Sequence, residues 1–258
     1  MHRLSLGRSL YLIVIGPAGS GKTTLTAAFG RWIEENQGFR VAYVNLDPGA
    51  DQLPYKPDVD VREWVTVSQL MREKGLGPNG ALIASMEEVY ARRSDLMREI
   101  ANLEAEIVIV DTPGQMELFL FHEAGPAISR ELAKLGAASA VMLFDSSLAA
   151  KPSHFVTLKL MSMVAQLRLE VPTVAVLSKG DLGVASLAIA WARDPEALLA
   201  ELKLEPGVVS ELSSRLVEVL NEFRLAARVP IVSSTTGEGF RELYDLLHEI
   251  WCACGDVT

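Results

Sequence analysis

Short apolar runs of four to six residues, rich in β-branched side chains, recur along the chain. Polar residues rarely alternate within them, which is typical of strands buried on both faces of a parallel sheet. The pattern predicts strands at Tyr11–Ile15, Val41–Leu46, Ile107–Val110, Ala140–Phe144, Thr173–Leu177 and Val229–Val232.

Longer segments with apolar residues near helical spacing separate these runs. They predict helices at Thr23–Glu35, Met86–Glu106, Glu117–Leu135, Phe155–Leu169, Val208–Phe223 and Gly239–Trp251. Alternating strands and helices predict an α/β fold with a doubly wound, mostly parallel sheet. Some intervals between strands are too long for one crossover. We therefore expect a single domain over residues 1–258, with helical insertions at about 50–106 and 183–228.

The composition fits a chain that buries a full core, with 49% hydrophobic and 22% charged residues. The net charge of −9 argues against a general nucleic-acid-binding surface, which needs a basic excess. The apolar run Leu10–Ile15 is too short for a secretory signal, and no stretch is long enough to predict a membrane span. We expect a cytoplasmic location.

Cysteine and histidine are few. Cys252 and Cys254 are too few for a disulfide framework. They form a Cys-Ala-Cys pair that is open to two interpretations, a part of a metal site or small residues of the tail. The four histidines are scattered along the chain, at His2, His122, His154 and His248. This favours the second interpretation.

A glycine-rich loop follows the first predicted strand and opens the first predicted helix. Its sequence, Gly16-Pro-Ala-Gly-Ser-Gly-Lys-Thr23, matches the P-loop pattern G-x-x-x-x-G-K-[ST] in the context that the motif requires. Backbone N–H groups of such a loop and the helix dipole bind phosphate oxygens. Lys22 is expected at the β- and γ-phosphates, and the Thr23 hydroxyl at Mg²⁺. The predicted nucleotide-binding residues here are Gly16, Gly19, Ser20, Gly21, Lys22, Thr23 and Thr24.

A second motif, Asp111-Thr-Pro-Gly-Gln115, follows a predicted buried strand. Ligands bind at the carboxyl ends of strands in open α/β sheets, so Asp111 is expected near Mg²⁺ or its waters. Gly114 can present its N–H to a γ-phosphate, and Gln115 and Glu117 can orient an attacking water. Behind a P-loop, this motif indicates a nucleotide hydrolase that senses the γ-phosphate.

A third motif, Ser178-Lys-Gly-Asp181, resembles the guanine-specificity motif of GTPases, N/T/S-K-x-D. A carboxylate such as Asp181 accepts hydrogen bonds from guanine N1–H and from the 2-amino group, which adenine lacks. The stem of Lys179 can lie along the base and ribose. The final predicted strand is followed by three residues at the place where GTPases contact the guanine oxygen, Ser233, Ser234 and Thr235.

The segment Asn45-Leu-Asp-Pro-Gly-Ala-Asp51 follows the second predicted strand. Asp47 can accept a hydrogen bond from a catalytic water or bind Mg²⁺ indirectly. It can equally cap a turn, as Asp commonly does. The residues alone leave both interpretations open.

Taken together, these motifs and the Gly77-Pro-Asn79 turn resemble the GPN-loop GTPases, in particular the archaeal-type members. The resemblance spans nearly the whole chain, including "YVNLDPGAD", "GLGPNGA", "DTPGQMELFLFHE" and the "CACGD" tail. It departs from the family in an N-terminal extension of about ten residues and in Ser178, where Asn is common.

The resemblance implies a homodimeric P-loop GTPase that hydrolyses GTP to GDP with Mg²⁺. It implies that Asn79 enters the partner's phosphate site, and that Asp47, Asp111, Gln115 and Glu117 hold the attacking water and surround Mg²⁺. It also implies that Thr23, Asp47 and Asp111 form the metal-binding set. A protein client is expected, for example during assembly of a large complex such as RNA polymerase. No direct nucleic-acid or membrane partner is expected.

Three alternatives compete with this hypothesis. A P-loop kinase for a small molecule or polynucleotide explains the P-loop, but it makes Ser178–Asp181 a coincidence. A metallocentre-maturation GTPase would usually carry a His- or Cys-rich tract. A non-catalytic nucleotide-binding scaffold is disfavoured because Lys22, Thr23, Asp111 and Gln115 are all present.

Overall fold

The computed structural model describes residues 9–182, 185–222 and 228–255. Within these residues, six parallel strands form one sheet in the order β3-β2-β4-β1-β5-β6. The strands are β1 (Leu10–Ile15), β2 (Val41–Asn45), β3 (Val59–Asp60), β4 (Ile107–Asp111), β5 (Ala138–Asp145) and β6 (Thr173–Ser178). The predicted doubly wound parallel sheet is therefore confirmed.

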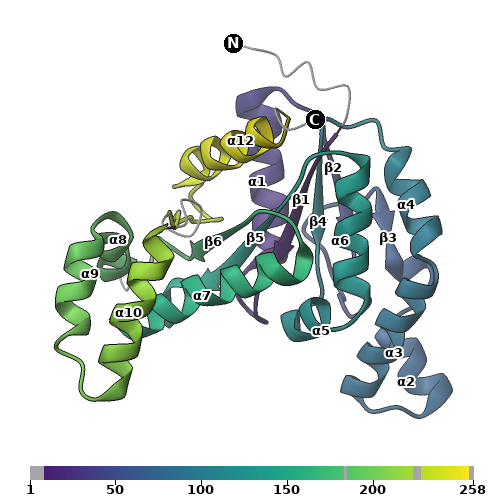
Figure 1. Ribbon diagram of the computed structural model, residues 1–258. Coiled ribbons are helices and arrows are strands. Elements are labelled where there is room, and N and C mark those ends of the chain that lie inside the picture. The colour runs from purple at the N-terminus through teal and green to yellow at the C-terminus, as the bar shows by residue number, and fades with distance from the viewer. Residues whose placement is uncertain (1–8, 183–184, 223–227, 256–258) are drawn as a thin grey trace.

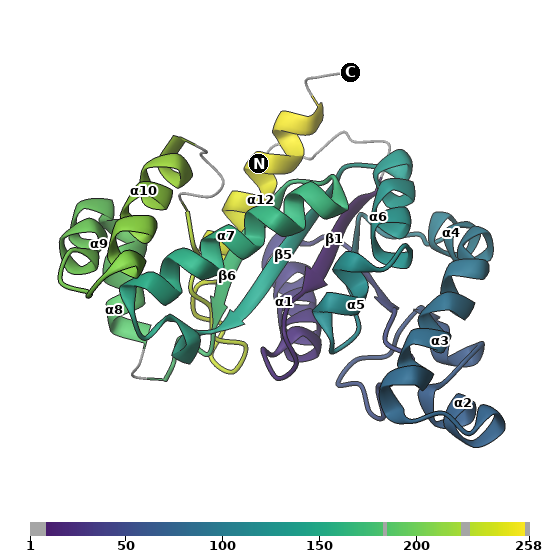
Figure 2. The ribbon, with the colours of Figure 1, turned by 60° about the horizontal axis from the view of Figure 1, so that its bottom comes forward.

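Helices cover both faces of this sheet, which explains why its strands are apolar throughout (Figures 1 and 2). Alternate side chains of β1 enter two separate core clusters: Leu12 faces one and Ile13 the other. One cluster is completed by α1 (Lys22–Gln37) and α12 (Phe240–Gly255). The opposite cluster includes α7 (Pro152–Leu169), which follows the short helix η2 (Ser146–Ala149).

The first insertion lies beyond the β3 end of the sheet (Figure 1). It contains η1 (Val61–Glu63), α2 (Val67–Lys74), α3 (Pro78–Ala91) and α4 (Arg93–Ala101). The prediction of one helix over Met86–Glu106 is wrong in its bounds. Pro78 starts α3 earlier because its fixed φ suits the first helical position. The chain leaves helical geometry at Arg92, where ψ is 13°, and the second helix ends at Ala101.

The second insertion lies beyond β6 and contains α8 (Ala185–Arg193), α9 (Pro195–Leu202) and α10 (Val208–Glu222) (Figure 1). Residues 183–184 of this predicted insertion, Phe223, and residues 224–227 fall outside the described residues. The division of the whole chain into a single domain stays a prediction.

Two further predictions need correction. The helix predicted over Glu117–Leu135 is two helices, α5 (Met116–Phe121) and α6 (Ala124–Leu135). The first turn of α6 packs closely against α5 at Gly125, where a Cβ would lie 1.8 Å from the Phe119 carbonyl oxygen. The strand predicted at Val229–Val232 is reduced to one parallel bridge between Ile231 and Leu177 of β6. Among the described residues, no helix combines the length and apolar character needed to cross a membrane.

Candidate nucleotide site

The glycine-rich loop joins β1 to α1 at the carboxyl edge of the sheet, as the sequence predicts. Gly16, Gly19 and Gly21 all have positive φ. At Gly16 a Cβ would lie only 2.2 Å from the Leu143 carbonyl oxygen, so the loop can pass this close to β5 only with glycine. The chain thus adopts the backbone conformation that a phosphate cradle requires.

Lys22 is buried at the start of α1, and its ammonium faces the same loop. Its Nζ donates to the carbonyl oxygens of Gly16 at 2.9 Å and Pro17 at 3.1 Å. Burial lowers the pKa of Lys22, while the carboxylates of Asp111, Asp47 and Glu117 act in the opposite direction. One cation therefore lies among three carboxylates, where it can also neutralise phosphate oxygens.

Asp111 ends β4, next to the P-loop strand, and is 1% exposed. Its Oδ2 accepts a hydrogen bond from the Tyr55 hydroxyl at 3.0 Å, whereas its Oδ1 has no partner among the described residues. Burial raises the pKa of Asp111 to about 6, against the lowering effect of the nearby Thr23 hydroxyl, Tyr55 and Lys22. A buried carboxylate oxygen without a partner is rare, and it indicates a missing ligand or water.

Asp47 follows β2 and links two loops of the site. Its Oδ1 accepts from the Gly49 N–H at 2.8 Å, which is the turn-capping role left open above. Its Oδ2 accepts from the Gly114 N–H at 3.2 Å, so it also contacts the Asp111–Gln115 motif. Burial raises the pKa of Asp47 and these two N–H groups lower it. We expect the Gly114 N–H to bind a γ-phosphate, but in this conformation it donates to Asp47.

Asn79 lies in the first turn of α3, directly after the connection from α2, and is exposed. Its Oδ1 is 3.4 Å from Nε2 of Gln115 in the same chain. Glu117 is exposed in the first turn of α5, close behind Gln115. The Gly-Pro-Asn segment therefore lies beside the predicted water-positioning residues of the same chain.

A pocket of about 250 Å³ opens next to the P-loop, beside the Ser178–Asp181 motif. Its lining contains Ser20, Gly21, Thr24, Ser178, Lys179, Asp181, Leu182, Ser234 and Thr235. Eight of these nine residues are predicted nucleotide-binding residues, and Leu182 is the addition. The two parts of the predicted site, phosphate and base, are therefore adjacent.

Ser178 ties these parts together. Its buried hydroxyl is shared between the carbonyl oxygens of Ser20 at 2.7 Å and Phe144 at 3.1 Å. Lys179 adopts a left-handed conformation with φ of 57°, and its Nζ lies 2.6 Å from Oδ2 of Asp145 at the end of β5. Asp181 is exposed at the pocket.

Ser233 has a different place from its two neighbours. It is fully buried and does not line the base pocket. Its hydroxyl accepts from the N–H groups of Thr235 at 3.3 Å and Thr236 at 3.2 Å. Its role in the described conformation is to shape the turn that presents Ser234 and Thr235.

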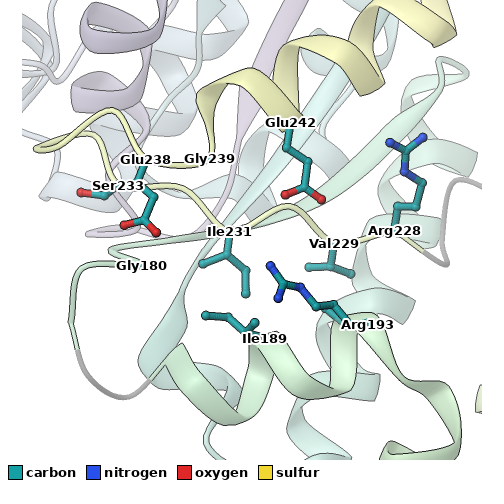
Figure 3. A pocket seen from close by; sticks show the side chains of 11 residues that line it. Gly180, Ile189, Arg193, Arg228, Val229, Ile231, Ser233, Glu238, Gly239 and Glu242 are labelled. Atoms are coloured by element: carbon teal, nitrogen blue, oxygen red, sulfur yellow. The ribbon is translucent and has the colours of Figure 1, made fainter.

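Behind this turn lies a second pocket of about 230 Å³ between α8 and the start of α12 (Figure 3). The side chains of Arg193 and Glu242 point into it from these two helices, over the apolar side chains of Ile189, Val229 and Ile231 (Figure 3). It shares Gly180 and Ser233 with the base-side loops but contains none of the P-loop residues.

The residues predicted for Mg²⁺ fit such an ion. Asp111 keeps one buried oxygen that has no partner in the described part of the chain, and Thr23 and Asp47 lie close enough to affect its pKa. No group of three His, Cys, Asp or Glu suited to a metal occurs in the described part of the chain. This agrees with P-loop proteins, where one hydroxyl, phosphates and waters supply most Mg²⁺ ligands.

In the described part of the chain, no cluster of metal-binding side chains forms around the cysteine pair. Sγ of Cys252 lies 3.6 Å from Nδ1 of His248 on α12, one helical turn earlier. The side chain of Cys254, like residues 1–8 of the N-terminal extension and His2 within them, lies outside what the structure describes.

Sequence reasoning missed the residues that support the site from the first insertion. Asp60 holds Arg62 in a bidentate ion pair, with Oδ2 and Nη2 2.6 Å apart. Arg62 in turn donates to the Ala50 carbonyl oxygen at 3.0 Å, which fixes the loop after Asp47. Tyr55 was also missed. The strand beside them, β3, has only two residues and gives no periodic signal. The sequence therefore could not place Tyr55 near Asp111, or Arg62 near the loop after Asp47.

Comparison with known proteins identifies relatives of this chain. A family model described as a conserved hypothetical ATP binding protein matches residues 14–253. The chain is 39% identical over 254 residues to GPN-loop GTPase PAB0955 of Pyrococcus abyssi, covering 96% of this chain and all of that protein. It is 30% identical to GPN-loop GTPase 1 of Dictyostelium discoideum, covering 91% of this chain and 59% of that longer protein.

The same fold occurs in a solved structure. The crystal structure of the apo form of PAB0955, described as a GTPase from Pyrococcus abyssi, superposes with a TM-score of 0.87 at 37% identity. The match covers 95% of this chain and 98% of that chain. The family model's description names ATP, whereas the names of these relatives say GTPase.

Proposed function

The chain belongs to the GPN-loop GTPase family, and from this membership we propose that it hydrolyses GTP to GDP and phosphate with Mg²⁺ as cofactor. One observation carries the proposal: the P-loop, the buried Asp111 and the Asp181 pocket meet at one edge of the sheet. We assign the phosphate, magnesium and guanine contacts to that edge. The word "ATP" in the family model's description is outweighed by Asp181, whose carboxylate finds its donors on guanine.

The residues divide the work of phosphoryl transfer, which consists mainly of positioning and charge stabilisation. Lys22 and the P-loop N–H groups bind the phosphates, and Gly114 exchanges its hydrogen bond to Asp47 for one to the γ-phosphate. Gln115 orients the attacking water. The Thr23 hydroxyl, with Asp111 and Asp47 nearby, would hold Mg²⁺, and the ion would supply positive charge that offsets the negative charge of the phosphates.

The base assignment is tested by Asp181→Asn. The wild type should prefer GTP over ATP and XTP, whereas the variant should prefer XTP, because the Asn amide can donate to the 2-oxo group of xanthine. Phosphate release from the three nucleotides measures the preference, with Thr24→Ala as a control that changes the pocket but not the base reader. Equal hydrolysis of ATP and GTP by the wild type would contradict the guanine assignment.

We further propose that the protein acts as a homodimer in which Asn79 completes the partner's phosphate site. In support, Asn79 is exposed, and its Oδ1 lies 3.4 Å from Nε2 of Gln115, a predicted water-positioning residue. A two-fold symmetric pair can then exchange the two loops reciprocally. A neutral amide stabilises developing charge less than a guanidinium, so slow turnover suited to a switch is expected.

Mixing two impaired variants tests this arrangement. Asn79→Ala should lower hydrolysis while nearly preserving GTP affinity, and Lys22→Ala should lose phosphate binding. In a mixed dimer, the subunit with intact Lys22 receives an intact Asn79 from its partner, so activity returns. If Asn79 acts within its own subunit, no mixing ratio restores hydrolysis.

We also propose that the nucleotide state controls a protein client, for example during assembly of a large complex such as RNA polymerase. Family resemblance is the support for this step. Co-purification from native cells with the protein loaded with GDP or with a slowly hydrolysed GTP analogue tests it, and a client should be retained in one state only. Identical protein sets in both states would contradict a nucleotide-controlled switch.

A further inference from the structure

Tyr55 lies outside the sequence motifs, and its hydroxyl donates a hydrogen bond to the side chain of Asp111. The segment from Asp47 to Asp58 connects β2 to β3, and its two ends touch the same Asp111–Gln115 motif. Near its start, Asp47 accepts from the Gly114 N–H at 3.2 Å. Near its end, the Tyr55 hydroxyl donates to Oδ2 of Asp111 at 3.0 Å. This one loop therefore contacts the motif at two residues, Asp111 and Gly114.

The ring of Tyr55 is fixed against the sheet. It stacks on Tyr43 of β2, with ring centroids 5.1 Å apart and an angle of 29° between the planes. Tyr43 itself is joined to the same loop by two hydrogen bonds. The Asp58 N–H donates to the Tyr43 carbonyl at 2.8 Å, and the Tyr43 N–H donates to Oδ2 of Asp58 at 2.8 Å. The hydroxyl of Tyr55 is therefore aimed at Asp111 by rigid support.

This contact decides which oxygen of Asp111 is open. Asp111 is 1% exposed, so its carboxylate oxygens depend on protein groups or a bound ligand, and not on bulk water, for hydrogen bonds. Oδ2 is taken by Tyr55, and Oδ1 is the oxygen with no partner among the described residues. A fixed carboxylate with a single open oxygen is what a site needs to receive one ordered water or ion.

We propose that Tyr55 is a positioning residue that orients the Asp111 carboxylate so that Oδ1 faces the magnesium side of the site. This inference rests on the proposed GTPase function with Mg²⁺. Tyr55 acts through Asp111 and touches neither nucleotide nor water in this role. Without its hydroxyl, the carboxylate samples orientations in which Oδ1 is turned away, and Mg²⁺ strengthens nucleotide binding less effectively.

Tyr55→Phe removes only the hydroxyl and keeps the stacked ring. Tyr43→Phe is the matched control, because it makes the same change on the stacking partner, whose hydroxyl has no hydrogen bond to Asp111 among the described residues. A fluorescent GDP analogue is titrated into each protein in EDTA and at a series of Mg²⁺ concentrations. Thermal melting of the nucleotide-free proteins confirms that all three are folded at the temperature of the titration.

We expect the Mg²⁺ concentration at half-effect to rise by about tenfold in Tyr55→Phe, the size of losing one hydrogen bond to a charged group. Affinity for the analogue in EDTA should equal that of the wild type, and Tyr43→Phe should match the wild type in both conditions. A merely structural role of Tyr55 would lower the melting temperature and the EDTA affinity, and leave the Mg²⁺ response unchanged.

The inference is overturned if the half-effect concentration of Tyr55→Phe is unchanged or lower, or if Tyr43→Phe shifts it equally. In either case a wild type that responds to Mg²⁺ leaves the proposed function standing. A wild type whose nucleotide affinity does not respond to Mg²⁺ overturns both.

Discussion

Replacing Asp111 with Asn should make the nucleotide-free protein more stable while abolishing its activity. Asp111 is 1% exposed, and burial raises its pKa from 3.8 to about 6. Because the folded-state pKa lies above the unfolded value, ionisation of Asp111 opposes folding. This penalty is absent below about pH 4, grows between pH 4 and 6, and is constant above that range. Asn keeps the shape of the neutral acid and should escape the penalty.

The magnitude follows from the two pKa values. A pKa difference of about two corresponds to about 3 kcal/mol, which is an upper value because the Asn amide must also find a partner beside Lys22. We therefore expect Asp111→Asn to raise the free energy of unfolding by about 2–3 kcal/mol at pH 7.5. For a chain of this size, each kcal/mol corresponds to about 2–4 °C in melting temperature.

Urea denaturation with EDTA and without nucleotide, at pH 7.5 and pH 4.5, provides the assay. Carboxylates outside the Lys22 cluster titrate alike in both proteins, so their effects cancel in the difference between variant and wild type. The gain should be present at pH 7.5 and largely lost at pH 4.5. A variant that is less stable than the wild type at pH 7.5, or a gain that does not change with pH, would refute the reasoning.

Three further predictions concern stability elsewhere in the chain. Gly16→Ala should lower the free energy of unfolding by at least about 3 kcal/mol, because its Cβ would lie 2.2 Å from a carbonyl oxygen. Gly114→Ala is the control in the same thermal denaturation, and it should stay near wild type because the space around its Cβ is open. Ser178→Ala should lose about 1–3 kcal/mol by removing a buried donor, and it should also weaken GDP binding in calorimetry. Lys159 is 4% exposed and burial lowers its pKa to about 8, so Lys159→Met should gain about 3 kcal/mol at pH 7, a gain that fades as pH rises from 8 to 10.5.

The sheet was predictable because its strands are buried on both faces. Continuous apolar runs locate β1, β2, β4, β5 and β6 to within a few residues, and the P-loop places the site at their carboxyl ends. β3 was not predictable, since two residues carry no periodicity. The run at Val229–Val232 has strand character but makes only one bridge, because pairing with β6 depends on the surrounding chain.

The site was predictable where function fixes residue types in a local motif. Asp111, Lys22 and Asp181 lie where the motifs place them. Contacts between distant segments were not predictable: Tyr55 with Asp111 is separated by 56 positions and Gln115 with Asn79 by 36. Such pairs are set by how the first insertion packs against the sheet, and no local pattern encodes that packing.

The most direct test of the central claim, a magnesium-dependent site built for guanine nucleotide, is phosphate release from GTP and ATP by the wild type. Both nucleotides are supplied at equal concentration, with Mg²⁺ and with EDTA. Because ATP leaves the acceptors of Asp181 unpaired, release from GTP with Mg²⁺ should exceed release from ATP by at least about 100-fold and should fall to background in EDTA. Comparable release from ATP, or GTP hydrolysis that persists in EDTA, would contradict the account.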